Sequence, residues 1–260
     1  MRVLKGFIFD LDGTIYLDDH IIDGASEAIK TLKERGDKVV FLTNKSIANR
    51  KEYVEKLNLM GINVELSEVI NSNYITAHYL KTVMDENDSV YVIGEGPLFE
   101  ELANENIKLA DNPASATHVV LGWDRQFTYD KLNNAFQAWR NGAEILATNP
   151  DRTCPVKDGE IPDCGAMIGA LEGATGEQVK MITGKPSSLM AEYVLGNVLG
   201  MKADQCYMVG DRLETDIKMA NDAGIHSVLV LSGITTEGML ESAAHQPDFV
   251  LESVKDIASL

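Results

Sequence analysis

Short apolar runs recur along this chain and alternate with longer segments of helical pattern. The runs are nearly continuous rather than alternately apolar and polar, as in "GFIFD" at 6–10 and "KVVFL" at 38–42. Continuous apolar runs of this length are typical of strands buried on both faces of a sheet. Strands that alternate with helices form parallel sheets joined by right-handed crossovers. The sequence therefore predicts an α/β fold.

Seven strands and four helices can be placed from the sequence. The predicted strands are residues 6–10, 38–44, 89–94, 118–124, 144–149, 206–211 and 226–233. The predicted helices are residues 24–35, 46–60, 128–140 and 188–199, each with a start or stop signal from capping chemistry. Two polar, turn-rich stretches, "DENDS" from Asp85 and "GATGEQ" at 173–178, have the composition of linkers.

Composition excludes several classes of protein. The chain has 260 residues, which is enough for one large domain or two modest ones, and its formal net charge is −17. Because non-specific nucleic-acid binding relies on Lys and Arg, this charge argues against a nucleic-acid partner. No apolar run is long enough to span a membrane, and no export signal is visible, so we expect a cytoplasmic protein without a membrane partner. An anionic substrate would require a local positive group, either a metal ion or a well-placed lysine.

The cysteines and histidines give no sign of a zinc site. Cys154, Cys164 and Cys206 form no CxxC pair, and the five histidines are scattered along the chain. An odd number of cysteines without an export signal favours reduced thiols in the core over a disulfide or a metal role. Oxygen and nitrogen groups are thus the better candidates for chemistry.

Polar residues gather where the predicted strands end. In open parallel sheets, ligands bind beyond the carboxyl ends of the strands. The residues at or near these ends are Asp10, Asp12, Thr43, Asn44, Lys185, Asp211 and Asp216. Several carboxylates that converge cannot all stay ionised without a cation, and oxygen ligands suit Mg²⁺. Mg²⁺ and a lysine would also let an acidic protein hold a phosphate.

The pair Asp10 and Asp12 can be interpreted in two ways. Held beside Mg²⁺, Asp10 can act as a nucleophile, since carboxylates form aspartyl-phosphate intermediates. Asp12 can then serve as general acid and base in a different environment. The alternative is a purely structural role, in which "DLDG" only forms a turn after a strand. The whole set of strand-end residues favours the first interpretation.

The motifs "DLDGT", "TN", "GKP" and "GDRLETD" resemble, in order and spacing, the four motifs of the haloacid dehalogenase-like hydrolase superfamily. The long insertion between "TN" and "GKP" resembles its NagD-type branch, also called the class IIA or para-nitrophenyl-phosphatase-like branch. The resemblance implies a Rossmann-like parallel-sheet core over 1–81 and 181–260 and an inserted α/β cap over 82–180. It also implies sugar phosphates, nucleotides or similar compounds as substrates.

The resemblance also implies the roles of the site residues. Asp10 is the expected nucleophile and Asp12 the general acid and base. Thr43 and Lys185 are expected to bind the transferred phosphoryl group, with Asn44 beside them. Mg²⁺ is expected on Asp10, on the backbone carbonyl of Asp12 and on Asp211, with Asp216 in support. One departure is "PDCG", where many branch members have a glycine in place of Asp163, which lies in the cap and bears on substrate preference.

The function that these features favour is a Mg²⁺-dependent phosphatase of small phosphate monoesters. The predicted partner is a small phosphorylated metabolite. The sequence leaves open whether the protein also forms a homo-oligomer. A haloacid dehalogenase would need neither the metal ligands nor Asp12. A phosphomutase and a non-catalytic protein that binds phosphorylated metabolites stay open as alternatives on the same fold.

Four weaker signals lie outside these motifs. "VYVIGEGPLFEEL" lacks the third glycine of a dinucleotide fingerprint and predicts a strand-to-helix turn in the cap. Trp123 with Asp124 either contacts substrate or packs in the core. The segment 149–151, "NPD", ends a predicted strand of the cap, and the sequence leaves open whether it faces the active site. His226 at the start of a strand favours a structural role.

Overall fold

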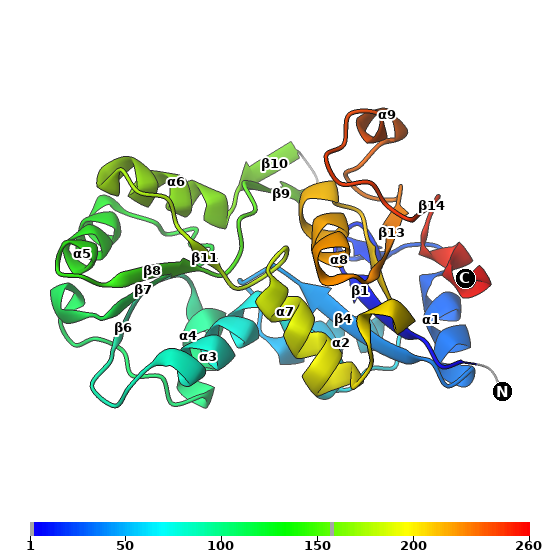
Figure 1. The fold of residues 1–260 in the computed structure, drawn as a ribbon, viewed down its shortest axis with the longest axis horizontal. Helices are drawn as coiled ribbons and strands as arrows, with labels where there is room; N and C mark the ends of the chain where they lie inside the picture. Colours follow the sequence, from blue (N-terminus) through cyan, green and yellow to red (C-terminus); the bar gives the residue numbers. More distant parts are fainter. Residues whose placement is uncertain (1–2, 157–158) are drawn as a thin grey trace. The chain divides into compact units, whose positions relative to one another are not determined.

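The computed structural model describes residues 3–156 and 159–260, which form two compact units. Unit 1 consists of Met1–Thr43, Arg50–Ile70 and Lys185–Leu260, and unit 2 consists of Asn44–Asn49 and Asn71–Gly184. The chain therefore passes between the units four times. Each unit contains its own parallel sheet (Figure 1).

Unit 1 is built on a six-stranded sheet. In spatial order its strands are β14 (Phe249–Leu251), β13 (His226–Val230), β12 (Cys206–Gly210), β1 (Gly6–Asp10), β4 (Lys38–Thr43) and β5 (Val69–Asn71). The pairs β14–β13, β13–β12, β12–β1 and β1–β4 are parallel. The chain runs from β1 toward β5 on one side and from β12 toward β14 on the other. The direction of winding thus changes at β1, which is where open α/β sheets form their ligand-binding crevice.

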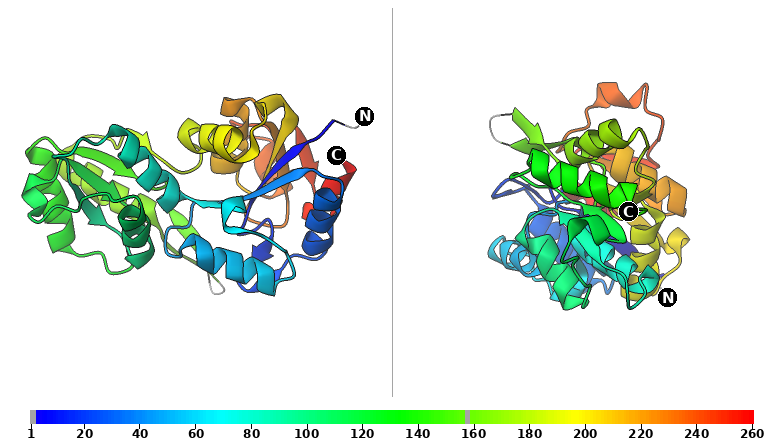
Figure 2. Two further views of the ribbon diagram at one scale, coloured as in Figure 1. Left: turned by 90° about the horizontal axis from the view of Figure 1, so that it is seen from below. Right: turned by 90° about the vertical axis from the view of Figure 1, so that its left-hand side faces the viewer.

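Helices cover both faces of this sheet. Figure 2 shows α7 (Ser188–Tyr193) and α8 (Lys218–Ala223) on one face, and α1 (Ala25–Glu34) and α2 (Arg50–Leu59) on the other. Phe7, Ile8 and Phe9 are all at most 1 % exposed. Since successive residues of a strand point to opposite faces, their burial confirms that both faces are covered, as the continuous apolar runs predict.

Shorter elements complete unit 1. A small hairpin of β2 (Tyr16–Leu17) and β3 (His20–Ile21) follows β1. A π-helical segment, Val194–Leu199, continues α7, and a second one, Leu213–Ile217, leads into α8. Helix α9 (Glu237–Leu240) and a 3₁₀ segment, Val254–Ser259, lie near the end of the chain. Turns of 3₁₀ helix also occur at Leu66–Glu68 and Ala203–Gln205.

Unit 2 contains a four-stranded parallel sheet between two pairs of helices. The order is β11 (Met181–Ile182), β8 (Glu144–Ala147), β7 (His118–Leu121) and β6 (Val90–Ile93). Helices α3 (Ser72–Val83) and α4 (Gly96–Asn104) lie on one face, and α5 (Tyr129–Arg140) and α6 (Cys164–Thr175) on the other (Figure 1). On β7, Val120 packs with the first pair, whereas Val119 and Leu121 pack with the second.

Two further elements of unit 2 lie outside this layered sheet. A hairpin of β9 (Thr153–Val156) and β10 (Gly159–Pro162) precedes α6. A 3₁₀ turn, Pro113–Ser115, precedes β7. The strand-to-helix turn predicted from "VYVIGEGPLFEEL" is confirmed as β6 followed by α4.

The units differ from the predicted domain limits mainly at the third crossing, after Ile70. The sequence-based limits place residues 71–81 in the core, whereas the structure places α3 in unit 2, because Ala77 and Leu80 pack against Leu98 and Leu102 of α4. The second limit differs by four residues, since unit 2 ends at Gly184. The two linker-like stretches both lie within unit 2.

Most predicted elements are present with small shifts at their ends. The predicted helix 46–60 starts only at Arg50, because residues 44–49 belong to unit 2, where the hydroxyl of Ser46 accepts the N–H of Trp123 at 3.1 Å. The three cysteines are free and buried, which confirms core thiols. Within the described parts of the chain, no helix is long and apolar enough to cross a membrane.

Candidate active site

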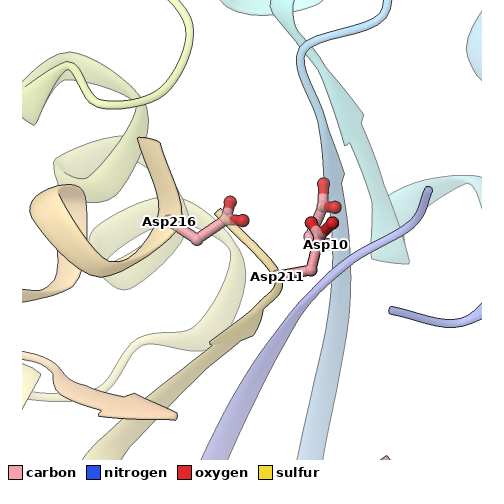
Figure 3. A group of neighbouring side chains, drawn as sticks. All are labelled: Asp10, Asp211 and Asp216. Carbon is pink, nitrogen blue, oxygen red and sulfur yellow. The ribbon is translucent and has the colours of Figure 1, made fainter. Parts of the chain in front are cut away.

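Three carboxylates meet at the carboxyl ends of β1 and β12. Asp10 closes β1, Asp211 directly follows the neighbouring strand β12, and Asp216 lies in the π-helical segment behind it. Figure 3 shows the three side chains at the ends of these strands. One oxygen of each lies within 4.8 Å of the others, and the residues are only 7 %, 1 % and 0 % exposed. The sequence-based expectation that these residues converge is met.

The ammonium group of Lys185 lies among these carboxylates. It donates hydrogen bonds to Oδ1 of Asp10 and, at 2.7 Å, to Oδ1 of Asp216. Lys185 is 2 % exposed. Burial disfavours its charged form, but the charges of Asp10 and Asp216 outweigh burial, so the pKa of Lys185 is above its ordinary value. The lysine is therefore a fixed buried cation.

One lysine does not balance the acids of the site. Burial raises the pKa of Asp10 well above its ordinary value, against the opposing charge of Lys185, and the neighbouring acids add to the rise. Burial, followed by the charge of Asp216, raises the pKa of Asp211 to about 6. These shifts indicate an excess of negative charge that an added cation would relieve.

One buried oxygen of the site, Oδ1 of Asp211, is available for a hard cation. The N–H of Ile234 donates to Oδ2 of Asp211 at 2.8 Å, whereas its Oδ1 is buried and has no hydrogen-bond partner among the described residues. Both oxygens of Asp216 are engaged, one by Lys185 and one by the N–H of Arg212 at 3.1 Å. An unsatisfied buried carboxylate oxygen is costly. Asp10 and Asp211 are thus suited to bind Mg²⁺ directly, and Asp216 to hold Lys185 in place.

Three glycines leave room for this arrangement. A Cβ atom on Gly210 would lie 2.3 Å from the carboxyl group of Asp216, and one on Gly233 would lie 2.0 Å from Oδ2 of Asp211. Gly13, with a φ of +83°, also faces Asp211. Gly233 was not predicted as a site residue, although the "SG" at the end of a predicted strand is a visible signal.

Asp12 lies in the loop that joins β1 to the hairpin of β2 and β3. It is partly exposed, unlike Asp10. A single β-bridge pairs Asp12 with the buried Tyr16, and the N–H of Gly13 donates to the carbonyl oxygen of Tyr16 at 2.8 Å. Burial, followed by the charge of Asp12, raises the pKa of Tyr16 well above its ordinary value, so the hydroxyl keeps its proton. Tyr16, which was not singled out from the sequence, is thus the buried neighbour of Asp12 in this loop.

Thr43 and Asn44 are neighbours in sequence but belong to different units. Thr43 ends β4, beside β1, and is 2 % exposed. Asn44 begins the first segment of unit 2, and its Nδ2 donates to Oδ2 of Asp151 at 3.1 Å. The carbonyl oxygen of Asn44 accepts the amide of Asn149 at 3.0 Å and the hydroxyl of Ser72 at 2.6 Å. The side chain of Asn44 is therefore engaged within unit 2.

The remaining candidates have structural contacts. Trp123 is 2 % exposed and packs in the core of unit 2, and Asp124 forms an ion pair with Lys131 at 2.6 Å. Asp163 caps the start of α6 by accepting the N–H of Cys164. His226 contacts the carbonyl oxygen of Asp204 through its ring at 3.2 Å. These contacts account for the four residues through packing, pairing and capping.

The chain matches known proteins over nearly its whole length. A model described as haloacid dehalogenase-like hydrolase matches residues 7–108, and a second model of HAD-like hydrolases matches residues 182–257. Sugar-phosphatase AraL of Bacillus subtilis is 40 % identical over 98 % of this chain and 92 % of its own. Phosphoglycolate phosphatase 1A of Arabidopsis thaliana is 35 % identical, over 98 % of this chain and 77 % of its own.

Solved structures agree with these matches. The 4-nitrophenylphosphatase of Thermotoga maritima has a TM-score of 0.92 and 36 % identity, covering 99 % of this chain and 97 % of its own. NagD of E. coli has a TM-score of 0.88 and 29 % identity, with 98 % of each chain covered. The chain therefore belongs to the haloacid dehalogenase-like hydrolase family, in the branch of NagD and the p-nitrophenyl phosphatases, and is a phosphoric monoester hydrolase.

Proposed function

We propose that this protein is a Mg²⁺-dependent phosphatase of small phosphate monoesters that acts through an aspartyl phosphate on Asp10. The observation that carries the proposal is the buried contact between Asp10 and Lys185 next to the unpartnered oxygen of Asp211. This arrangement combines a nucleophile, a fixed cation and a site for a second cation. It also supplies the local positive group that a chain with a net charge of −17 needs to bind phosphate.

Asp10 carries out the first chemical step. One of its oxygens attacks phosphorus and forms the aspartyl phosphate as the bond to the leaving oxygen breaks. The ammonium of Lys185, already on Oδ1 of Asp10, offsets the charge that spreads over the phosphoryl oxygens. Thr43, at the end of the adjacent strand, contributes its hydroxyl to phosphoryl binding, and Asn44 continues that loop.

Asp12 moves the protons of both steps. In the first step its carboxylic acid gives a proton to the leaving oxygen. The resulting carboxylate takes a proton from the water that hydrolyses the aspartyl phosphate. The two carboxylates can divide these roles because Asp10 is buried against Lys185, whereas Asp12 is partly exposed.

The metal would be held by Asp10, the backbone carbonyl of Asp12, and Asp211, with Asp216 in support. When bound, Mg²⁺ supplies positive charge that attracts the substrate phosphate and stabilises the transition state. Asp216 keeps Lys185 oriented through their 2.7 Å contact.

The named relatives support the chemical class that we propose for the substrate. They include a sugar phosphatase and a phosphoglycolate phosphatase. We therefore propose that the substrate is a small phosphorylated metabolite.

Phosphate release from a panel of esters tests the proposal. The panel contains sugar phosphates, phosphoglycolate, nucleoside monophosphates and p-nitrophenyl phosphate, each assayed with Mg²⁺ and with EDTA. We expect release that depends on Mg²⁺ and is highest for one or a few small metabolites. Full activity after exhaustive metal removal would contradict the metal site. Isomerisation of a sugar phosphate without phosphate release would instead support a phosphomutase.

A further inference from the structure

The segment 232–235, which follows β13, lies against Asp211, one of the proposed metal ligands. Strands β12 and β13 are parallel neighbours, so the residues that follow them lie at the same edge of the sheet. The N–H of Ile234 donates to Oδ2 of Asp211 at 2.8 Å, and the N–H of Thr235 donates to its backbone carbonyl oxygen at 3.3 Å. One segment therefore holds both the side chain and the backbone of Asp211.

Two glycines from different loops lie against the Asp211 carboxylate. A Cβ atom on Gly233 would lie 2.0 Å from Oδ2, and one on Gly13 would lie 2.4 Å from the same oxygen and 3.1 Å from Cα of Gly233. The backbone of each loop thus approaches this oxygen more closely than a residue with a side chain would allow. Contacts with both loops fix Oδ2, whereas Oδ1 is buried and has no hydrogen-bond partner in the described part of the chain.

The hydroxyl of Ser232 joins these two loops. It donates to the carbonyl oxygen of Gly13 at 2.8 Å. Gly13 in turn donates its N–H to the carbonyl oxygen of Tyr16 at 2.8 Å. Because the N–H and C=O of a trans peptide point in opposite directions, this bond also sets the direction of the Asp12 carbonyl. Ser232 thus ties the segment that holds Asp211 to the loop that carries Asp12.

We propose that Ser232 is a positioning residue, whose hydroxyl keeps the Asp211 carboxyl group turned with Oδ1 toward the cation. The inference rests on the proposed function, which places Mg²⁺ on Asp10, Asp211 and the Asp12 carbonyl. The terminal torsion of an aspartate is broad, so a carboxyl group needs outside contacts to hold one orientation. Here the N–H of Ile234 makes such a contact, and Ser232 holds the segment that presents this N–H. Contacts that orient a metal ligand typically contribute about 10- to 100-fold to metal affinity.

Ser232→Ala tests this inference because it removes the hydroxyl and leaves the backbone unchanged. Isothermal titration of the full, metal-free chain with MgCl₂, in the absence of substrate, measures the Kd for Mg²⁺ directly. We expect this Kd to rise about 10-fold. Ser232→Thr keeps a hydroxyl at the same place and should bind Mg²⁺ within about threefold of the wild-type Kd.

The inference also predicts that metal affinity and turnover separate. With p-nitrophenyl phosphate, the Mg²⁺ concentration that gives half the maximal rate should rise about 10-fold in Ser232→Ala. At saturating Mg²⁺, kcat should fall less than about twofold, because excess metal fills the weakened site by mass action.

Ser227→Ala is the matched control for the loss of a serine hydroxyl. Ser227 is buried and lies near the start of β13, at the opposite end of the strand from the segment 232–235. Its hydroxyl donates to the carboxylate of Asp248 at 3.1 Å and accepts the N–H of the same residue at 2.9 Å. The variant should lower the melting temperature at least as much as Ser232→Ala does, since it breaks two hydrogen bonds. Its Kd for Mg²⁺ should stay within about twofold of the wild type.

Two results would overturn the inference. The first is a wild-type Kd for Mg²⁺ in Ser232→Ala. The second is an equal rise of the Kd in Ser227→Ala, which would trace the weaker binding to a general loosening of unit 1 rather than to the orientation of Asp211.

The same titration tells the two proposals apart. If the wild type binds Mg²⁺, Asp211→Asn does not, and Ser232→Ala binds like the wild type, only the positioning role fails. If the wild type does not bind Mg²⁺, the proposed metal site fails, and the inference fails with it.

Discussion

Removal of one charge, in Asp211→Asn, is predicted to stabilise the metal-free protein. The pKa of Asp211 is raised from 3.8 to about 6, mainly by burial and then by Asp216. A shift of about 2 units corresponds to about 3 kcal/mol of cost for the ionised form. Asparagine has the same shape, keeps an oxygen for the N–H of Ile234, and directs an amide toward the neighbouring carboxylates. The variant therefore avoids the cost without opening a cavity.

The sign of the pH dependence follows from the raised pKa. Between about pH 4 and 6 the folded protein binds more protons at Asp211 than the unfolded chain, so stability falls as the pH rises. The contribution of Asp211 is complete below about pH 4 and is lost as the pH passes through about 6. The stability advantage of Asp211→Asn should therefore grow from about 1.5 kcal/mol at pH 5 to about 3 kcal/mol at pH 7.5.

Scanning calorimetry in EDTA is the appropriate assay, because both tryptophans, Trp123 and Trp139, lie in unit 2 and their fluorescence does not report on unit 1. An advantage of about 3 kcal/mol corresponds to a rise of about 6–12 °C in Tm. Excess Mg²⁺ should stabilise the wild type, by about 2.7 kcal/mol at a hundredfold excess over Kd, and should have little effect on the variant.

Asp222→Asn provides the control, since it removes the same charge from an exposed ion pair in unit 1. Its Tm should stay within a few degrees of the wild type. An Asp211→Asn variant that is less stable than the wild type in EDTA at pH 7.5 would refute the account of the site as an excess of buried negative charge.

Three further predictions follow from single positions. Gly210→Ala places a Cβ atom 2.3 Å from the carboxyl group of Asp216 and should lower kcat/KM about 100-fold in steady-state assays, whereas Gly238→Ala, with open space around it, should not. Lys185→Arg keeps the charge but changes the donor geometry, so kcat/KM should fall about 10²- to 10³-fold; wild-type kinetics would remove the lysine from the site. Burial raises the pKa of Cys164 to about 12, so only about one thiol in 10⁴ is ionised at pH 8. Mass spectrometry after iodoacetamide treatment should find it unmodified in native protein and alkylated in urea.

The sheet of each unit could be predicted from the sequence, because continuous apolar runs require two covered faces. All seven predicted strands are present, and the strand-end residues Asp10, Asp211 and Lys185 meet as expected. The short strands β5, β11 and β14 were not predicted, since two or three residues are too few to show a pattern. Helix α3 was not predicted because its apolar residues give no clear stripe.

The points at which the chain changes unit could not be predicted from composition. The linker-like stretches lie within unit 2. The chain instead passes from unit 1 to unit 2 directly after Thr43, inside a polar loop whose composition does not change there. The amide of Asn44 donates to the carboxylate of Asp151, more than a hundred residues away, which adjacency to Thr43 does not reveal. Likewise, the ammonium of Lys56 on α2 lies 3.9 Å from the centre of the Tyr16 ring, although the two residues are far apart in the sequence. Such contacts arise from the tertiary fold rather than from local sequence.

Rapid mixing of the Asp12→Asn and Asp10→Asn variants with p-nitrophenyl phosphate tests the central claim most directly. The account predicts that Asp12→Asn releases a burst of about one equivalent of nitrophenol per enzyme and then turns over slowly, because it forms the aspartyl phosphate but lacks the base to hydrolyse it. After an acid quench, mass spectrometry should find the phosphate on Asp10. Asp10→Asn should give neither burst nor phosphorylated peptide. A burst from Asp10→Asn, or phosphate on another residue of Asp12→Asn, would contradict the assignment of Asp10 as the nucleophile.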